Sequence, residues 1–236
     1  MKDLLIRSLT VDWTEVAEDS YLREIPALRG LEHLAFRRPV TFFAGENGSG
    51  KSTLLEAIAV AYGFNAEGGS RNFHFSTYED VSELGEAVRF ARGTVKPGAG
   101  YFFRVESFFN VATAIVERYN DGAQPDYHQR SHGESFLEYM SRSGRPGLYL
   151  MDEPEAALSA QRQLTLLCHI AQRAAAGSQF IIATHSPILL AVPDAEILEF
   201  SESGIHPCAW RDTESYRVTK LFLDNPERML QRLLEE

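Results

Sequence analysis

The chain has 236 residues, of which 44% are hydrophobic, and this fits one domain over residues 1–236 with a full core and a smaller subdomain. Its formal charge of −10 opposes nonspecific attachment of the whole surface to nucleic acid or anionic lipid. No apolar run reaches the length of a membrane span and the N-terminus lacks a signal-peptide pattern, so we expect a soluble, cytoplasmic protein.

The first half of the chain alternates between strand-like and helical patterns. A glycine at position 63 is a common helix stop, and the aromatic and branched residues after Gly100 favour a strand. In chain order we expect a strand over 4–11, an irregular stretch to 35, a strand over 40–44, a helix over 52–63, a loop over 64–80, a short helix over 83–92 and a strand over 100–106.

The second half continues this alternation. Apolar runs without a polar alternation, separated by helices, indicate a mainly parallel sheet that is covered on both faces. We expect helices over 108–119 and 134–142 joined by a polar connection, and then a strand over 148–151. A long helix that closes at Gly177 follows, with an apolar face made of Leu158, Leu164, Leu167, Cys168 and Ala171. We then expect a strand over 180–183, a hairpin or edge strands over 196–210 and helices over 213–235.

Cysteines and basic clusters indicate no further site. Cys168 and Cys208 have neither zinc spacing nor the number of a disulfide framework, so we interpret both as reduced and structural. The densest positive stretches are interpreted as solvated surface rather than as a DNA-binding stripe: Arg37 with Arg38, and Arg89, Arg92 and Lys96.

A glycine-rich segment stands directly between a predicted strand and a predicted helix. Residues 45–52 read GENGSGKS, which matches the phosphate-binding pattern G-x-x-x-x-G-K-[ST]. Glycines allow the backbone to turn N–H groups onto phosphates, while Lys51 would contact the β and γ phosphates and Ser52 would bind Mg²⁺. An accidental glycine-rich turn is the alternative, but the flanking strand and helix favour a nucleoside triphosphate site.

Two further polar segments follow predicted strands directly. Asp152 and Glu153 come after the strand over 148–151, where one acid can hold Mg²⁺ and the other can orient a water; helix N-terminal acids are the alternative. His185 comes after the strand over 180–183. Because ligands bind at the carboxyl ends of strands in open α/β sheets, His185 is predicted to donate to the γ-phosphate, although a lone histidine is more often structural.

A third segment, Ser131-His132-Gly133-Glu134, opens a predicted helix and would be another anion site, or an ordinary helix cap. Together these segments resemble the ATP-binding-cassette (ABC) ATPase family over roughly residues 35–200, within the branch of predicted AAA/ABC ATPases related to DNA-repair and phage-defence proteins. The resemblance implies a P-loop NTPase fold with a reduced helical subdomain over 107–145.

The resemblance also implies residue roles. The catalytic residues would be Glu153, His185 and Lys51, and the metal ligands Ser52, Asp152 and Glu106, the last in roughly the position of the Q-loop glutamine. The segment over 156–159 takes the place of the D-loop, and Tyr21 that of the aromatic residue that stacks on adenine, with packing as its alternative. His132 and Glu134 depart from the LSGGQ signature. The nucleotide-binding residues would be Gly45, Glu46, Asn47, Gly48, Ser49, Gly50, Lys51, Ser52 and Thr53, with Ser131 and Gly133.

The family mechanism implies ATP and Mg²⁺ as cofactors and a head-to-tail homodimer with ATP between the P-loop of one chain and the signature turn of the other. A span of 80 residues from Lys51 to Ser131 leaves little room for the subdomain that docks a membrane partner, so a non-transport ATPase is favoured over a transporter subunit. An effector protein or nucleic acid would then be the partner. A nucleotide-gated binding module with negligible turnover is a third reading.

Overall fold

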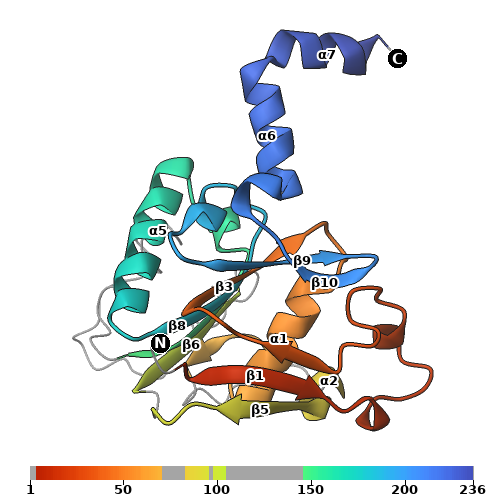
Figure 1. Ribbon diagram of the computed structural model, residues 1–236, viewed down its shortest axis with the longest axis vertical. Helices are drawn as coiled ribbons and strands as arrows, with labels where there is room; N and C mark the ends of the chain where they lie inside the picture. Colours follow the sequence, from red (N-terminus) through yellow and green to blue (C-terminus); the bar gives the residue numbers. More distant parts are fainter. Residues whose placement is uncertain (1–3, 71–82, 96–97, 105–145, 236) are drawn as a thin grey trace, which may run out of the picture.

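The computed structural model describes residues 4–70, 83–95, 98–104 and 146–235. Its centre is a seven-stranded sheet with the strand order β10-β9-β3-β8-β7-β6-β4 (Figure 1). Five neighbouring strands from β9 to β6 run parallel, and the edge strands β10 and β4 pair antiparallel. The predicted mainly parallel α/β sheet is therefore confirmed. Its strands are β3 (Val40–Gly45), β4 (Gly69–Ser70), β6 (Ala99–Arg104), β7 (Gly147–Asp152), β8 (Gln179–Ala183), β9 (Glu196–Ser201) and β10 (Gly204–Pro207).

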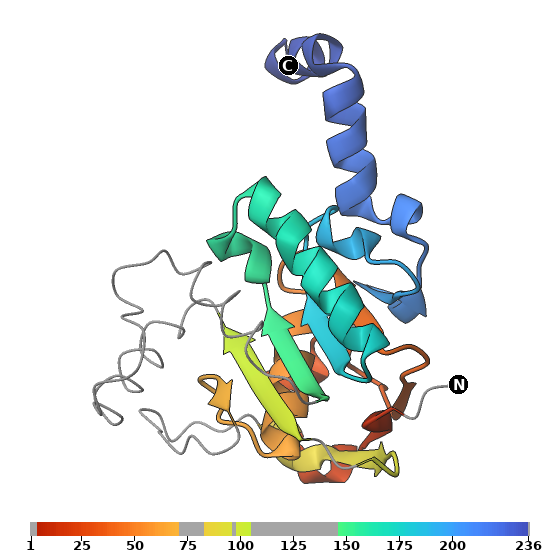
Figure 2. The ribbon, with the colours of Figure 1, turned by 90° about the vertical axis from the view of Figure 1, so that its left-hand side faces the viewer.

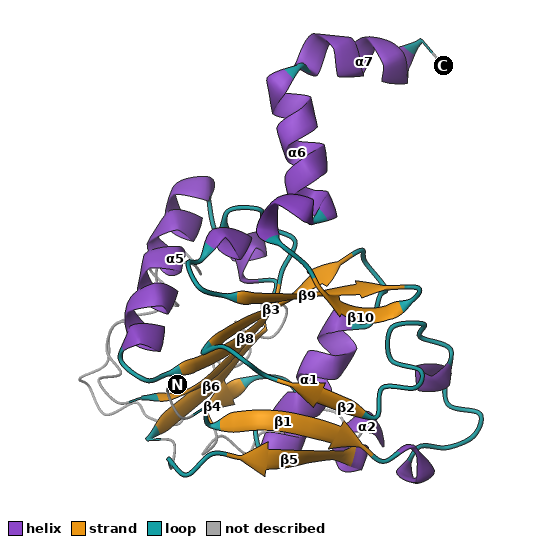
Figure 3. Ribbon diagram, viewed as in Figure 1, coloured by secondary structure: helices purple, strands orange, loops and turns teal. Residues whose placement is uncertain are grey.

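Helices cover both faces of this sheet (Figure 3). Helix α1 (Lys51–Tyr62) packs on one face, where Leu54, Leu55 and Ile58 join a core with Phe43. Helix α5 (Ala160–Ala175) packs on the other, and Figure 2 shows it lying across the strands. Its core includes Phe42. Since adjacent residues of a strand point to opposite faces, Phe42 and Phe43 contribute to different cores, which explains why β3 is apolar without alternation.

The apolar face of α5 differs from the prediction. The side chains that α5 buries are Leu166, Ile170 and Ala174, whereas Cys168 is exposed and Leu164 is 49% exposed. Leu158 is buried but precedes the helix, and Leu167 and Ala171 are partly buried at the margin of the core. The sequence of α5 contains two overlapping apolar stripes. The spacing of apolar residues alone predicted one of them, whereas the helix packs on the sheet with the other. The interpretation of Cys168 as a core residue is therefore wrong.

A second, three-stranded antiparallel sheet was not predicted. It has the order β2-β1-β5, with β1 (Ile6–Val11), β2 (His33–Ala35) and β5 (Val88–Arg92). The predicted helix over 83–92 is thus only α2 (Glu83–Ala87) followed by β5. Val88 to Arg92 form a strand because they pair with β1, a partner about 80 positions earlier in the chain that local pattern does not reveal.

A buried amide connects the two sheets. The side chain of Gln179 in β8 accepts a hydrogen bond from Ile6 N at 2.9 Å and donates one to Ile6 O at 2.9 Å. Both groups of one residue at the start of β1 are therefore satisfied by a single side chain, as a strand neighbour would do. This pairing fixes the small sheet beside the large one, with short 3₁₀ turns η1 (Trp13–Glu15) and η2 (Tyr21–Arg23) following β1.

The C-terminal segment forms two helices, α6 (Glu214–Asp224) and α7 (Pro226–Leu234), which confirms the predicted helical region. Figures 1 and 2 show both projecting from the body of the molecule. The predicted helices over 108–119 and 134–142, and the subdomain over 107–145, lie outside the described residues. In the part of the chain that is described, no helix is both long enough and apolar enough to cross a membrane.

Candidate nucleotide site

The strand register brings the predicted site residues to one edge of the large sheet. Ala183, the last residue of β8, pairs with Phe43 on one side and with Asp152 on the other. The ladder continues one step further, because Thr184 N donates to Phe43 O at 3.1 Å and Glu153 N donates to Ala183 O at 3.0 Å. The P-loop, the acidic pair and His185 therefore leave three neighbouring parallel strands at the same level, as the sequence predicted.

The P-loop connects β3 to α1 through glycines with positive φ. Gly45, Gly48 and Gly50 have φ angles of 132°, 79° and 97°, a region that other residues rarely adopt. At Gly45 there is a steric reason as well, since an added Cβ would lie 2.4 Å from Phe200 O in the adjacent β9. At Gly50 it would lie 2.7 Å from Ile25 Cγ2. The glycines thus permit both the turn and the close packing around it.

Lys51 is the first residue of α1 and is buried beneath the loop. Its Nζ donates to Gly45 O at 2.9 Å and to Glu46 O at 2.6 Å. Burial lowers the pKa of Lys51 from its ordinary value, and the nearby carboxylates of Glu153, Asp152 and Glu155 oppose that shift. Beside it, the hydroxyl of Ser49 is buried and makes no hydrogen bond with any described residue. The loop therefore presents an ammonium group and an unsatisfied donor.

Ser52 and Asp152 meet at the end of β7. Ser52 Oγ donates to Asp152 Oδ1 at 2.8 Å, although the residues are 100 positions apart in the chain. The other carboxylate oxygen of Asp152 lies 3.8 Å from Nε of Arg104, the last residue of β6, which pairs with Asp152 across the sheet. Arg104 also donates to Glu56 of α1 at 2.6 Å. Sequence reasoning missed Arg104; an arginine within the predicted strand over 100–106 was the available signal.

Glu153 and His185 form a second pair at this edge. His185 Nε2 lies 3.6 Å from Glu153 Oε1, but it is buried and makes no hydrogen bond within the described residues. Glu153 adopts a left-handed conformation with φ of 46° and ψ of 51°, which is uncommon for a residue other than glycine. Burial lowers the pKa of His185, and the positive charge of Lys51 acts in the same direction. The imidazole therefore favours its neutral form.

Glu155, which sequence reasoning did not select, holds the segment that carries His185. It belongs to the 3₁₀ turn η4 (Pro154–Ala157), and its Oε1 accepts hydrogen bonds from Thr184 Oγ1 at 2.7 Å, His185 N at 2.6 Å and Ser186 N at 3.1 Å. Ser186 Oγ in turn donates to Gln163 Oε1 of α5 at 2.6 Å. The predicted D-loop segment, from Ala156 to Ser159, adjoins this network, because Gln163 Nε2 donates to Leu158 O at 3.1 Å.

Comparison with known proteins agrees with this geometry. A family model described as an AAA domain matches residues 21–137, a segment that includes the P-loop and ends before Asp152. The chain has a P-loop NTPase-like α/β fold, and just under half of it matches the AAA domain family. No curated protein matches the sequence significantly.

Solved structures with a matching arrangement include ABC transporter structures and an SMC head domain. The SMC head domain from Thermotoga maritima has 15% identity and a TM-score of 0.41, and the match covers 89% of this chain and 100% of that one. The ADP conformation of an ATP-binding cassette of an ABC transporter has 17% identity and a TM-score of 0.45, covering 87% and 90%. A metal-chelate type ABC transporter has 18% and 0.39, covering 77% and 76%. At these values no conclusion about activity passes to this chain.

A cavity of about 490 Å³ adjoins the P-loop on the side of β9. Pro26 and Ala27 line it, together with loop residues and four carboxylates, those of Glu46, Glu199, Glu202 and Glu214. Since a triphosphate is strongly anionic, this acidic cavity does not suit the phosphates, which fit better on the side of Lys51 and Ser52. Tyr21, predicted either to stack on adenine or to pack, has a side chain that is 65% exposed. It is not among the residues that line this cavity.

Three predicted site residues remain to be placed. Glu106, Ser131 and Gly133 lie outside the described residues, as do His132 and Glu134, so their roles stay predictions. Thr53 follows Ser52 in the first turn of α1. Within the described ranges, no group of three or more histidine, cysteine, aspartate or glutamate side chains is arranged to hold a metal ion.

Proposed function

We propose that this chain binds ATP with Mg²⁺ and hydrolyses it to ADP and phosphate. One observation carries the proposal: Ser52, at the P-loop, donates to Asp152 at 2.8 Å, while Glu153 and His185 lie 3.6 Å apart on the adjoining strand ends. Phosphate-binding, metal-binding and water-orienting groups thereby converge at one sheet edge, which is the arrangement that phosphoryl transfer to water requires.

The P-loop would hold the triphosphate. The Nζ of Lys51 now donates to the carbonyls of Gly45 and Glu46, and phosphate oxygens would take their place as acceptors for the same ammonium. Backbone N–H groups of the loop and the N-terminus of α1 add positive potential at the same point. Ser49, whose buried hydroxyl makes no hydrogen bond in the described structure, would be satisfied by the ligand.

Ser52 and Asp152 fit a magnesium ion. Both offer oxygen atoms, and Mg²⁺ in nucleotide sites is typically held by one or two protein oxygens together with phosphates and waters. When bound, the ion would offset charge on the β and γ phosphates. Arg104, 3.8 Å from the other oxygen of Asp152, would keep that carboxylate oriented.

Glu153 would act on the attacking water. Its carboxylate is 47% exposed and so remains open to solvent, while its backbone is anchored to β8 through Ala183 O. A carboxylate positioned in this way can accept a proton from water as the water attacks. His185, whose imidazole is unsatisfied at Nε2, would donate from that nitrogen to a γ-phosphate oxygen.

We further propose that two copies enclose ATP head to tail. Lys51, Glu153 and His185 lie at one edge of the sheet in a single chain, so a second copy could cover the nucleotide there. In this arrangement Ser131 and Gly133 of the opposite chain would contact the γ-phosphate. A dimer that closes only around ATP would couple nucleotide state to subunit arrangement.

The process that this cycle serves is proposed to be a cytoplasmic, non-transport one, with an effector protein or nucleic acid as partner. The alternative is the ATP-binding subunit of a transporter whose membrane chain is separate. A pull-down with the full chain separates these readings, because recovery of an integral membrane protein would favour transport and recovery of a nuclease or nucleic acid would favour the first.

The test of hydrolysis is phosphate release by the wild type and by Glu153→Gln, with Glu32→Gln at an exposed position as matched control. We expect Glu153→Gln to lose at least a hundredfold in rate while still binding ATP, because general base catalysis typically contributes that much. In a background that is monomeric without nucleotide, Mg-ATP should shift the same variant toward dimer mass in light scattering. Equal phosphate release by all three proteins would instead favour a nucleotide-gated module without turnover.

A further inference from the structure

The C-terminal arm, defined as α6 together with α7, contacts the body of the molecule at the start of α6 and buries no residue beyond it. At the base, Trp210 Nε1 donates to Pro187 O at 2.9 Å, and the rings of Trp210 and Tyr216 meet edge to face at 4.8 Å. Thr213, immediately before α6, is buried and donates to Trp210 O at 2.7 Å. Beyond this point neither α6 nor α7 buries a residue. The base of the arm is therefore fixed to the body of the molecule, while the rest of α6 and α7 projects from it (Figure 1).

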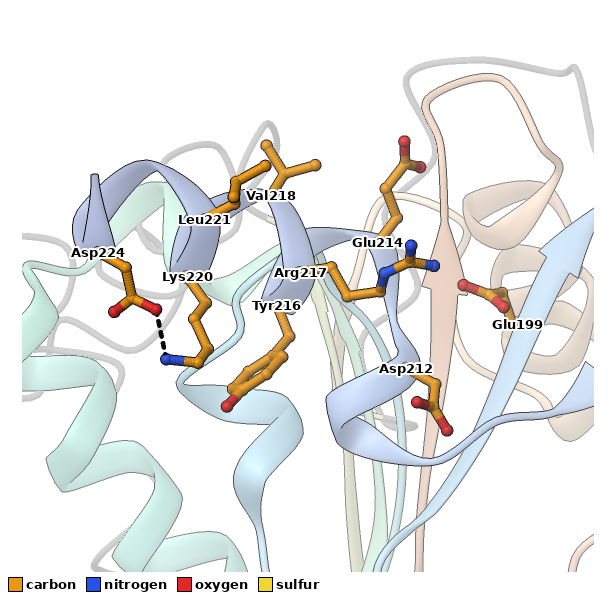
Figure 4. A pocket seen from close by; sticks show the side chains of 9 residues that line it. All are labelled: Glu199, Asp212, Glu214, Tyr216, Arg217, Val218, Lys220, Leu221 and Asp224. Carbon is orange, nitrogen blue, oxygen red and sulfur yellow. Dashed lines mark hydrogen bonds and ion pairs between the residues drawn. The ribbon is translucent and has the colours of Figure 1, made fainter. Parts of the chain in front are cut away.

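Each helix of the arm carries an apolar stripe at helical spacing. In α6 the stripe is Val218, Leu221 and Phe222, which are 49%, 58% and 38% exposed. Figure 4 shows Val218 and Leu221 on one side of α6 and Tyr216 and Lys220 on the opposite side. In α7 the stripe is Leu230, Leu233 and Leu234, which are 44%, 62% and 80% exposed. Arg228, Gln231 and Arg232 lie away from this stripe, on the polar side of α7.

Such a surface is costly to leave in water. Helices of 11 and 9 residues are shorter than the roughly 12–15 residues at which isolated helices become even marginally stable. Packing of the apolar stripe against a partner would therefore stabilise their helical form. Six large apolar side chains at these exposures offer an area on the order of several hundred Å², a size at which an exposed apolar patch is often functional.

We propose that the occupant of this stripe is the arm of a second copy, so that two arms pair through a two-fold axis into a four-helix bundle. Residues 214–236 contain five acidic and four basic residues, a net charge of −1, which leaves −9 on the remainder of the chain. Charges of both signs on one segment suit self-complementary pairing. A projecting, nearly neutral arm also permits association without bringing the acidic bodies together.

The charge pattern argues against a lipid surface as the occupant. Amphipathic helices that bind membranes are rich in lysine and arginine on the polar face, whereas acidic residues outnumber basic ones here. The available area supports a protein occupant, because a standard interface buries about 800 Å² on each partner and the stripe supplies a substantial part of that from apolar side chains alone.

The proposed pairing does not require nucleotide and is thus independent of the ATP-enclosed dimer. The test is the mass of the full chain by sedimentation velocity over a concentration series, in EDTA and without nucleotide. We expect a dimer for the wild type and for Lys51→Ala. The double variant Leu221→Glu, Leu233→Glu should weaken the dimer at least a hundredfold. The matched control Thr219→Glu, Gln231→Glu places the same charges on exposed positions outside the stripe and should remain dimeric.

A second measurement guards against a folding defect in the variants. Hydrogen exchange of amides in 214–235 should slow as wild-type concentration rises and should not respond to concentration in the double variant. A nucleotide-free wild type that is monomeric throughout, or a double variant as dimeric as the control, overturns the proposal. Retention of monomeric wild type on phosphatidylglycerol vesicles also overturns it and identifies lipid as the occupant.

Discussion

Glu155 Oε1 accepts a hydrogen bond from the backbone N–H of His185 at 2.6 Å, across 30 residues of sequence. The same oxygen accepts hydrogen bonds from Thr184 Oγ1 and Ser186 N, so one carboxylate fixes three consecutive residues directly after β8. Glu155 itself lies two residues after Glu153 in the turn η4. The proposed water-orienting acid and the proposed phosphate-contacting histidine are therefore tied together through a third residue that would contact neither water nor phosphate.

Replacing Glu155 with alanine should disorder this connection. Three donors would lose this acceptor, although Ser186 N would keep Thr184 Oγ1 at 3.0 Å as another. Since Thr184 is buried, we expect the free energy of unfolding to fall by about 2–4 kcal/mol. If Glu155 positions His185, the kcat for ATP should fall at least tenfold while KM changes little. Glu155→Gln keeps a carbonyl acceptor and should recover most of kcat. Thermal unfolding and steady-state ATPase assays measure both effects, and equal loss in the alanine and glutamine variants would argue against a positioning role.

Asp152→Asn separates the metal-binding role of this residue from its structural one. An asparagine oxygen can still accept from Ser52 Oγ, so stability should change by less than about 1 kcal/mol. The charge that would attract Mg²⁺ is lost, and ATP affinity should no longer depend on the ion. Calorimetric titration with ATP in Mg²⁺ and in EDTA checks this: the wild type should bind more tightly with Mg²⁺, and the variant should bind equally in both. A variant that keeps the wild-type ratio would show that Asp152 is not a ligand.

The part of the site that sequence predicted rests on local signals. Val40 to Ser52 contain their own strand, turn and helix pattern, and the positive φ angles of Gly48 and Gly50 follow from residue type. Asp152, Glu153 and His185 were found because each directly follows an apolar run that had to be a strand. Parallel strands end at one edge, so the position of these residues in the chain already implied that they would meet.

The missed residues depend on partners that no local pattern reveals. Arg104 matters because β6 lies beside β7, which puts it opposite Asp152. Glu155 is important because it accepts a hydrogen bond from the backbone of His185, a contact between residues that are 30 positions apart. The sequence around Glu155 does not indicate that contact. The small sheet has the same origin, since Val88 to Arg92 form a strand only against β1. In α5, the sequence contains two overlapping apolar stripes, and Cys168 belongs to only one of them. The sheet packs against the other stripe, so Cys168 is exposed.

The protonation of His185 gives a prediction that depends on pH. Burial and Lys51 lower the pKa of His185 below its ordinary value of 6.5, while Glu153 and Glu155 raise it to a lesser extent. Between the lowered pKa and 6.5, the unfolded chain therefore binds a proton that the folded chain does not.

The stability that comes from burying the neutral ring should thus be fully present above pH 6.5 and should decline as the pH falls below that value. We expect the difference in melting temperature between the wild type and His185→Gln to be constant at neutral and higher pH and to shift against the wild type on acidification. His33→Gln, at an exposed position on β2, is the matched control. A difference that moves in favour of the wild type at low pH would mean that Glu153 outweighs burial and that the imidazole is charged in the folded protein.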